Sequence, residues 1–267
     1  MKNIKNEFAV KIKEIKKSYR EQSRERRLEY KTALAKIKEE KDVHVADYYI
    51  KRGKKPPQNP PKRPILEEIG NSVTHGVGSV FAIVGLILML IASESLEERI
   101  SAIIYFFGLF LMFTMSCLYH AFPHGSTVKR LFRRFDYSGI YLLIGATFTP
   151  VLLCYFGDTF GLMFFAIQWV IIAAGISLVG VFGPAKLSYI HIPMYVILGW
   201  SALMLLPRMW ESDFSMAMWI LAGGILYTLG IIPFLMKSKI SHFIWHFFVL
   251  AGAVAQWIGI YMYIYIK

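Results

Sequence analysis

The sequence predicts an all-α, polytopic membrane protein with seven spanning helices. Two observations lead there: the composition is that of a lipid-embedded chain, and apolar runs of spanning length recur along it. Hydrophobic residues make up 55% of the 267 residues and charged residues only 18%, whereas soluble domains are about half apolar and about a quarter charged. The mean hydropathy is +0.45.

The apolar runs begin after Pro64, and each approaches the roughly 20 residues that cross ~30 Å of hydrocarbon. We expect the spans at about 71–92, 100–121, 136–156, 160–181, 189–206, 215–236 and 242–265. Barrel strands would be shorter and would alternate in polarity, so a helical bundle is the architecture that these runs allow. Short connections make consecutive helices antiparallel neighbours. Residues 65–267 therefore form the predicted membrane domain.

Loop charges predict how this domain is oriented. One side carries the basic N-terminal tail together with Lys129, Arg130, Arg133, Arg134, Lys186, Lys237 and Lys239. The other side has three basic residues, Arg99, Arg208 and Lys267, among six acidic ones. The positive-inside rule then places the N-terminus in the cytoplasm and the C-terminus outside. We expect a multi-pass protein of the cell (plasma) membrane.

The tail, residues 1–55, holds most of the basic excess: 20 of the 30 Lys and Arg precede Pro64, with 9 of the 18 acidic residues. Apolar residues recur every three or four positions between about 3 and 42, which predicts one long charged helix. This helix could be solvated, form a weak coiled coil or contact anionic lipid headgroups. It could also bind a protein partner. A proline-rich linker, 56–64, follows.

No cleavable signal peptide is expected, because no short apolar stretch follows the initiating Met. Cys117 and Cys154 lie in apolar runs without the spacing of a metal knuckle, so both are interpreted as packing residues. Membrane lipids, and not nucleic acid, are the expected partners.

Six of the seven histidines fall at one end of the predicted bundle. They are His75, His120, His124, His191, His242 and His246. His242 and His246 are four residues apart, so they lie on one helical face, where two imidazoles can share a tetrahedral ion. His120 ends a neighbouring span at the same depth and can supply a third nitrogen.

Three histidines leave a fourth coordination position for water, as catalytic zinc sites do. Asp136 opens the third predicted span at that depth, and Ser116 lies one turn before His120. Zinc lowers the pKa of a bound water to about 7, and a carboxylate can accept its proton. The alternative is that the histidines only bond to loop carbonyls or headgroups. His124 and His191 are interfacial by position and receive no role.

A second polar cluster lies where the first span enters the membrane. Glu68, Asn71, Thr74 and His75 gather there. They could cap the free N–H groups of the first turn. They could instead hydrogen-bond to the metal-binding histidines and orient them.

These motifs together resemble the signature of a known family. Glu68-x-x-Asn71-x-x-x-His75, Ser116-x-x-x-His120, Asp136-Tyr-Ser-Gly-Ile140 and His242-x-x-x-His246 occur in this order on the first, second, third and seventh spans. The set is similar to that of the hemolysin III family, the bacterial branch of the progestin and adipoQ receptor (PAQR) superfamily. The resemblance covers about residues 64–265 and leaves out the charged tail.

The resemblance implies seven helices with the N-terminus inside and a zinc ion held by His120, His242 and His246. It also implies that Asp136 and Ser116 contact or position a zinc-bound water. Relatives in the superfamily include alkaline ceramidases, so the first functional hypothesis is a zinc-dependent hydrolase of a lipid amide or ester, involved in membrane-lipid homeostasis. The second is a non-enzymatic sensor of lipid or membrane state. The third is a pore-forming cytolysin, which the gathering of polar residues at one end disfavours.

Overall fold

The structure is a computed structural model that describes residues 2–53, 59–236 and 238–266, and these residues form helices and turns but no strand. It separates into two compact units, one ending at Gln58 and one beginning at Asn59. Lys237, which the loop-charge argument counted, and the first part of the proline-rich linker lie outside the described residues.

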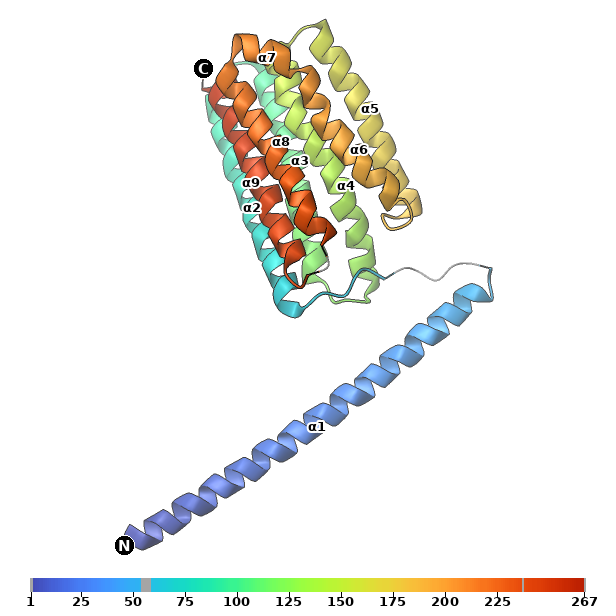
Figure 1. Ribbon diagram of the computed structural model, residues 1–267, viewed down its shortest axis with the longest axis vertical. Coiled ribbons are helices and arrows are strands. Elements are labelled where there is room, and N and C mark those ends of the chain that lie inside the picture. Colours follow the sequence, from blue (N-terminus) through green and yellow to red (C-terminus); the bar gives the residue numbers. More distant parts are fainter. Residues whose placement is uncertain (1, 54–58, 237, 267) are drawn as a thin grey trace. The chain divides into compact units, whose positions relative to one another are not determined.

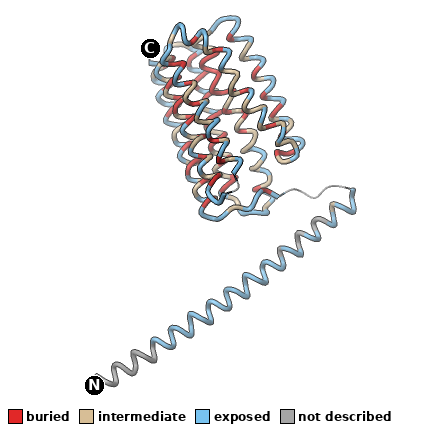
Figure 2. The backbone as a smooth tube through the Cα atoms, viewed as in Figure 1, coloured by how far each residue is buried: buried red, intermediate tan, exposed pale blue. Residues whose placement is uncertain are grey.

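The N-terminal unit is a single helix, α1 (Lys2–Ile50), of 49 residues. It continues eight residues beyond the predicted end near Asp42. Every side chain of α1 that the structure describes is exposed except that of Tyr49, which is intermediate, as the pale blue tube in Figure 2 shows. Helix α1 therefore has no core of its own.

The second unit is the membrane bundle (Figure 1). Its helices are α2 (Ile65–Ala92), α3 (Leu96–Ala121), α4 (Thr127–Pro150) with η1 (Val151–Phe156), α5 (Thr159–Phe182), α6 (Ser188–Trp200) with η2 (Ser201–Met204) and α7 (Leu206–Ser212), α8 (Phe214–Leu235), and α9 (Ser241–Ile260) with η3 (Tyr261–Tyr265). In the described part of the chain, seven helical segments are long and apolar enough to span a membrane. The predicted number of spans is confirmed.

Helices α2 and α4 begin furthest ahead of the apolar runs that predicted them. Helix α2 starts at Ile65, directly after Pro64, and α4 starts at Thr127, where Ser126 accepts a hydrogen bond from the Lys129 N–H at 3.0 Å. Both extensions carry polar residues, which hydropathy cannot assign to a span. As a consequence, Asp136 lies in the third turn of α4 and does not open it.

The helices that carry the polar cluster pack closely on one another. Helix α3 packs between α2 and α4, and α9 packs against α8 and α2. A Cβ added to Gly108 of α3 would lie 2.1 Å from the Ala146 Cβ of α4, and one added to Gly139 would lie 2.9 Å from the Met112 Cα. Small residues thus let the backbones of α3 and α4 approach, as is usual between membrane helices.

Candidate metal centre

Three histidines from two helices converge at one end of the bundle, called here the histidine end. His120 lies in the last turn of α3, and His242 and His246 lie in the first two turns of α9. One ring nitrogen from each of the three lies within 4.8 Å of the others. His120 and His246 are buried, and His242 is half-buried. The pair His242 and His246 and the third histidine expected from the sequence, His120, therefore lie close together in the structure.

The donor atoms of this group fit a metal ion. His120 Nε2 and His246 Nδ1 are buried and have no hydrogen-bond partner within the protein. Buried polar atoms are nearly always paired, because an unpaired one costs free energy. A cation bound between the rings would accept the lone pairs that the protein leaves without a partner. Among the described residues this group satisfies the geometry of a metal site.

An ion pair between Glu68 and Lys129 contacts the Nδ1 side of the His120 ring. The Glu68 carboxylate lies 2.6 Å from His120 Nδ1 through one oxygen and 2.9 Å from Lys129 Nζ through the other. A proton on Nδ1, shared with the carboxylate, directs the lone pair of Nε2 towards the other two histidines. Lys129 is buried and also donates to the Phe122 carbonyl at 3.0 Å.

Lys129 is the site residue that sequence reasoning missed. It was counted as a loop charge that sets topology, yet only 1% of its side chain is exposed. Four basic residues fall between 129 and 134, and nothing in their spacing distinguishes the one that turns inwards. Its burial follows from the early start of α4, which places Lys129 in the first turn of that helix.

The second polar cluster does not cap its helix. Pro64 occupies the N-cap of α2, and no side chain bonds to the free N–H groups there. Asn71 Nδ2 instead lies 3.3 Å from His120 Nδ1, and the His75 ring stacks on the His246 ring at 3.8 Å. The geometry thus favours the alternative in which Glu68, Asn71 and His75 surround the histidine group.

A cavity of about 350 Å³ opens beside the histidines. Its polar end is lined by His75, Ser116, Asp136, His242 and His246, together with Arg63 and Arg133. Asp136 accepts a hydrogen bond from Ser116. The Asp136 side chain is partly exposed because it faces this cavity.

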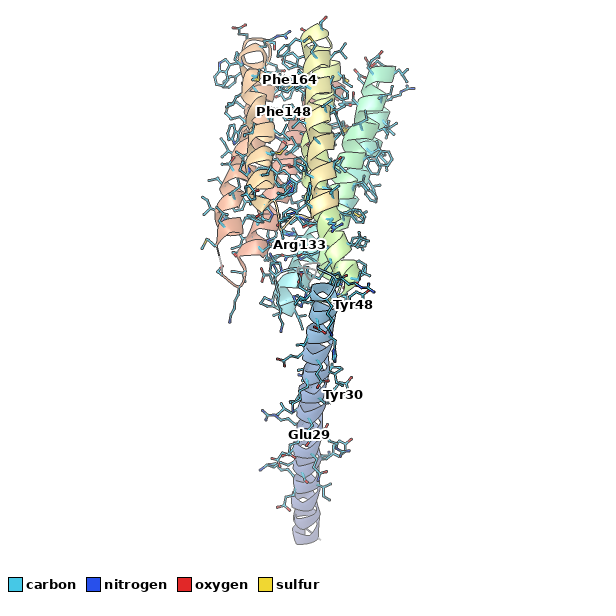
Figure 3. All side chains as sticks on the ribbon, turned by 90° about the vertical axis from the view of Figure 1, so that its right-hand side faces the viewer. Glu29, Tyr30, Tyr48, Arg133, Phe148 and Phe164 are labelled. Atoms are coloured by element: carbon cyan, nitrogen blue, oxygen red, sulfur yellow. The ribbon has the colours of Figure 1, made fainter. Side chains whose placement is uncertain are left out.

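The cavity continues along α4 from Arg133 to Phe148, the two residues labelled on this helix in Figure 3. At 1.5 Å per residue the distance between them is roughly 22 Å along the helix axis. Its walls beyond the histidine end are mostly apolar and include Ile140, Leu143 and Ile144. The cavity therefore has a polar end beside the histidines and a largely apolar remainder.

Two histidines lie apart from the group. His124 Nε2 lies 3.0 Å from the Pro60 carbonyl in the described part of the linker. His191, for which an interfacial position was predicted, lies in the first turn of α6 and is buried in the bundle, with its Nδ1 3.0 Å from the Tyr141 hydroxyl. Its burial against α4 places it inside the bundle, away from the convergent nitrogens.

Comparison with known proteins agrees with this architecture. A family model described as "Haemolysin-III related" matches residues 64–257. The chain belongs to the haemolysin-III-related family. The match contains the three convergent histidines together with Glu68, Lys129 and Asp136, and it excludes α1.

Individual relatives of this haemolysin-III-related chain come from bacteria and animals. "Hemolysin-3" of Bacillus cereus is 33% identical over 208 residues, which cover 75% of this chain and 93% of the relative. "Hemolysin-3 homolog" of Bacillus subtilis is 31% identical over 207 residues, or 74% and 95% of the two chains. "Monocyte to macrophage differentiation factor" of Homo sapiens is 31% identical over 206 residues, or 74% and 85%. The family resemblance read from the motifs is confirmed, and the protein is a multi-pass membrane protein.

Proposed function

We propose that this protein is a zinc-dependent hydrolase of membrane lipids that cleaves an amide or ester bond. The observation that carries the proposal is the convergence of three histidine nitrogens at the polar end of a largely apolar cavity within the membrane bundle. Three imidazoles with a fourth position open are the usual ligand set of catalytic zinc. An apolar channel of this length suits the hydrocarbon chain of a lipid, whose polar linkage would then face the histidines.

Zinc bound there would polarise a carbonyl group and make a water molecule acidic. The other tasks belong to residues of the chain. Asp136 is placed to take the proton of the attacking water and to return it to the leaving amine or alcohol. The Ser116 hydroxyl, bonded to Asp136, holds that carboxylate in one orientation. The Glu68–Lys129 pair holds His120.

Metal content by mass spectrometry on detergent-purified protein is the first test. Wild-type protein is compared with the His242→Ala/His246→Ala variant and with His124→Ala, a histidine outside the group. We expect about one zinc per chain in the wild type and in His124→Ala, and none in the double variant. A folded wild-type protein without bound metal would refute the proposed mechanism.

A zinc-loaded protein is then tested against ceramides, glycerophospholipids and other lipid amides and esters. Release of a fatty acid, lost in Asp136→Asn while zinc remains bound, supports a hydrolase. Full zinc occupancy without turnover of any of these lipids would instead favour the non-enzymatic sensor, with zinc in a structural role.

A further inference from the structure

Helix α1 carries an apolar stripe, interrupted between Tyr19 and Tyr30, that the N-terminal unit does not cover. Its members whose side chains are described are Ile15, Tyr19, Tyr30, Leu34, Ile37 and Tyr48, and all are exposed; Ile15, Tyr19 and Tyr30 are 69%, 69% and 67% exposed. With a period of 3.6 residues they fall within an arc of about 100° around the helix. Three further exposed apolar residues, Leu28, Val43 and Ile50, lie off this face.

The stripe keeps its direction because its members recur every 11 residues. Tyr19 and Tyr30 are 11 apart, as are Ile37 and Tyr48. Eleven residues make three helical turns plus about 20°, so the stripe drifts only slowly along α1; a strict seven-residue repeat drifts about 20° per repeat in the opposite direction and therefore more per residue. Arg26 occupies the 11-residue position between Ile15 and Ile37 and lies inside the arc, and Lys16, about five turns before Leu34, lies at its basic edge.

Charges of opposite sign flank the two sides of this stripe. On one flank lie the basic residues Lys13, Lys16, Lys17, Arg20, Arg24, Arg27 and Lys31. On the other lie the acidic residues Glu14, Glu21, Glu25, Glu29, Glu39, Glu40 and Asp47. Among the described side chains of α1, Lys36 is the exception, a basic residue on the acidic flank. The helix thus has three faces along its length: apolar, basic and acidic.

We propose that α1 is a self-association helix that pairs in parallel with α1 of a second copy of this chain. When two such helices face each other through their stripes in parallel, the basic flank of each lies beside the acidic flank of the other. In an antiparallel pair, basic would face basic and acidic would face acidic. The charge pattern therefore selects the parallel pair.

The same pattern argues against a lipid surface as the occupant of the stripe. Helices that lie on anionic membranes carry Lys and Arg beside their apolar face. On α1, Glu29, Glu40 and Asp47 border the stripe on one side, so anionic headgroups would meet like charge there. A second copy of α1 offers these carboxylates a basic flank instead.

Cysteine crosslinking of the full-length protein in membranes tests the pairing. Ser23 lies within the stripe and Ala35 on the opposite face, and both are small, exposed residues of α1. We expect Ser23→Cys chains to form disulfide-linked dimers at least about tenfold more than Ala35→Cys chains, because only the stripe would bring identical positions together. The unaltered chain, with Cys117 and Cys154, gives the background. Equal crosslinking of the two variants would overturn the proposal.

A charge exchange tests the direction of pairing. Glu29→Lys/Glu40→Lys adds basic charge to the acidic flank, and Arg20→Glu/Arg27→Glu adds acidic charge to the basic flank. Each variant alone should self-associate about tenfold more weakly than wild type, and a mixture of the two should regain association. Stronger binding of the first variant to anionic vesicles, with unchanged crosslinking through Ser23→Cys, would show instead that the stripe contacts lipid.

Discussion

The two ends of the membrane bundle use polar side chains in different ways. At the end opposite the histidines, several polar side chains cap helices by bonding to nearby backbone. Ser95 and Glu98 form a capping box at the start of α3, and Asp158 and Asp213 accept hydrogen bonds from backbone N–H groups three residues on. These contacts lie at helix N-termini. Contacts across helices at this end are also paired, since the Tyr265 hydroxyl donates to the Glu98 carbonyl and Arg208 pairs with Asp158.

At the histidine end, polar side chains contact one another across helices and remain incompletely paired. Of the twelve buried polar side-chain atoms without a partner among the described residues, six lie there. They are Arg63 Nη1, Asn71 Oδ1, His75 Nδ1, His75 Nε2, His120 Nε2 and His246 Nδ1. Local capping does not explain them, since their neighbours come from distant parts of the chain.

The difference teaches that polar residues cap helices at one end and form the candidate metal centre at the other. Polar groups buried in a membrane protein are costly and therefore mark function where their bonding is incomplete. Substitutions should consequently affect stability at the opposite end and metal binding or turnover at the histidine end. The following predictions test this contrast.

The largest effect is expected at Asp136. Asp136→Asn removes the proton acceptor but keeps the size of the side chain, so turnover of a lipid substrate should fall by about 10²–10⁴-fold. Zinc content should stay near the wild-type value, because the three residues whose donor atoms converge are all histidines and Asp136 is not one of them. Loss of zinc together with turnover would show that Asp136 is itself a ligand.

A smaller effect is expected behind His120. Glu68→Gln removes the carboxylate that contacts Nδ1, and metal affinity, measured by competition with a chelator, should fall by about 10–100-fold. The single variant also leaves Lys129 buried without its partner, which destabilises the protein.

The double variant Glu68→Gln/Lys129→Met separates these two consequences. It removes both charges of the pair, so thermal stability should recover relative to Glu68→Gln while metal affinity stays low. If affinity recovers together with stability, the pair acts only through folding and does not position His120.

Disturbing the close packing of α3 against α4 should lower the stability of the folded protein. Gly139→Ala places a Cβ 2.9 Å from the Met112 Cα, one turn from Asp136, and is expected to cost about 1–3 kcal/mol. Gly180→Ala is the matched control, because nothing lies within 4 Å of the added Cβ. Thermal unfolding in detergent measures both; equal melting temperatures would contradict the close approach.

The smallest effect is expected at the opposite end. The backbone N–H of Gly161 and the exposed Arg208 guanidinium hold the pKa of the Asp158 carboxyl below its ordinary value. The carboxylate therefore stabilises the folded protein above the ordinary aspartate pKa, and this contribution is lost as pH falls through the lowered pKa.

Asp158→Asn should accordingly lower the melting temperature slightly at pH 7, and the difference from wild type should vanish in acid. Zinc content should not change. A change in metal binding caused by this substitution would contradict the expectation that the end opposite the histidines affects stability alone.

The sequence by itself determined the number and order of the spans, because hydropathy over some 20 residues is a local property of the chain. It also indicated two of the three candidate ligands, because His242 and His246 are four residues apart and so share one face of a helix. The order of the motifs identified the family, which the comparisons confirm.

Tertiary structure decided what depends on residues far apart in the sequence. The inward turn of Lys129, its ion pair with Glu68 and the stacking of His75 on His246 all require α2, α3, α4 and α9 to pack together. The cavity from Arg133 to Phe148 likewise exists only between packed helices. Hydropathy assigns each residue a polarity, but burial and pairing arise when distant side chains meet, and only the packed bundle specifies which of them do.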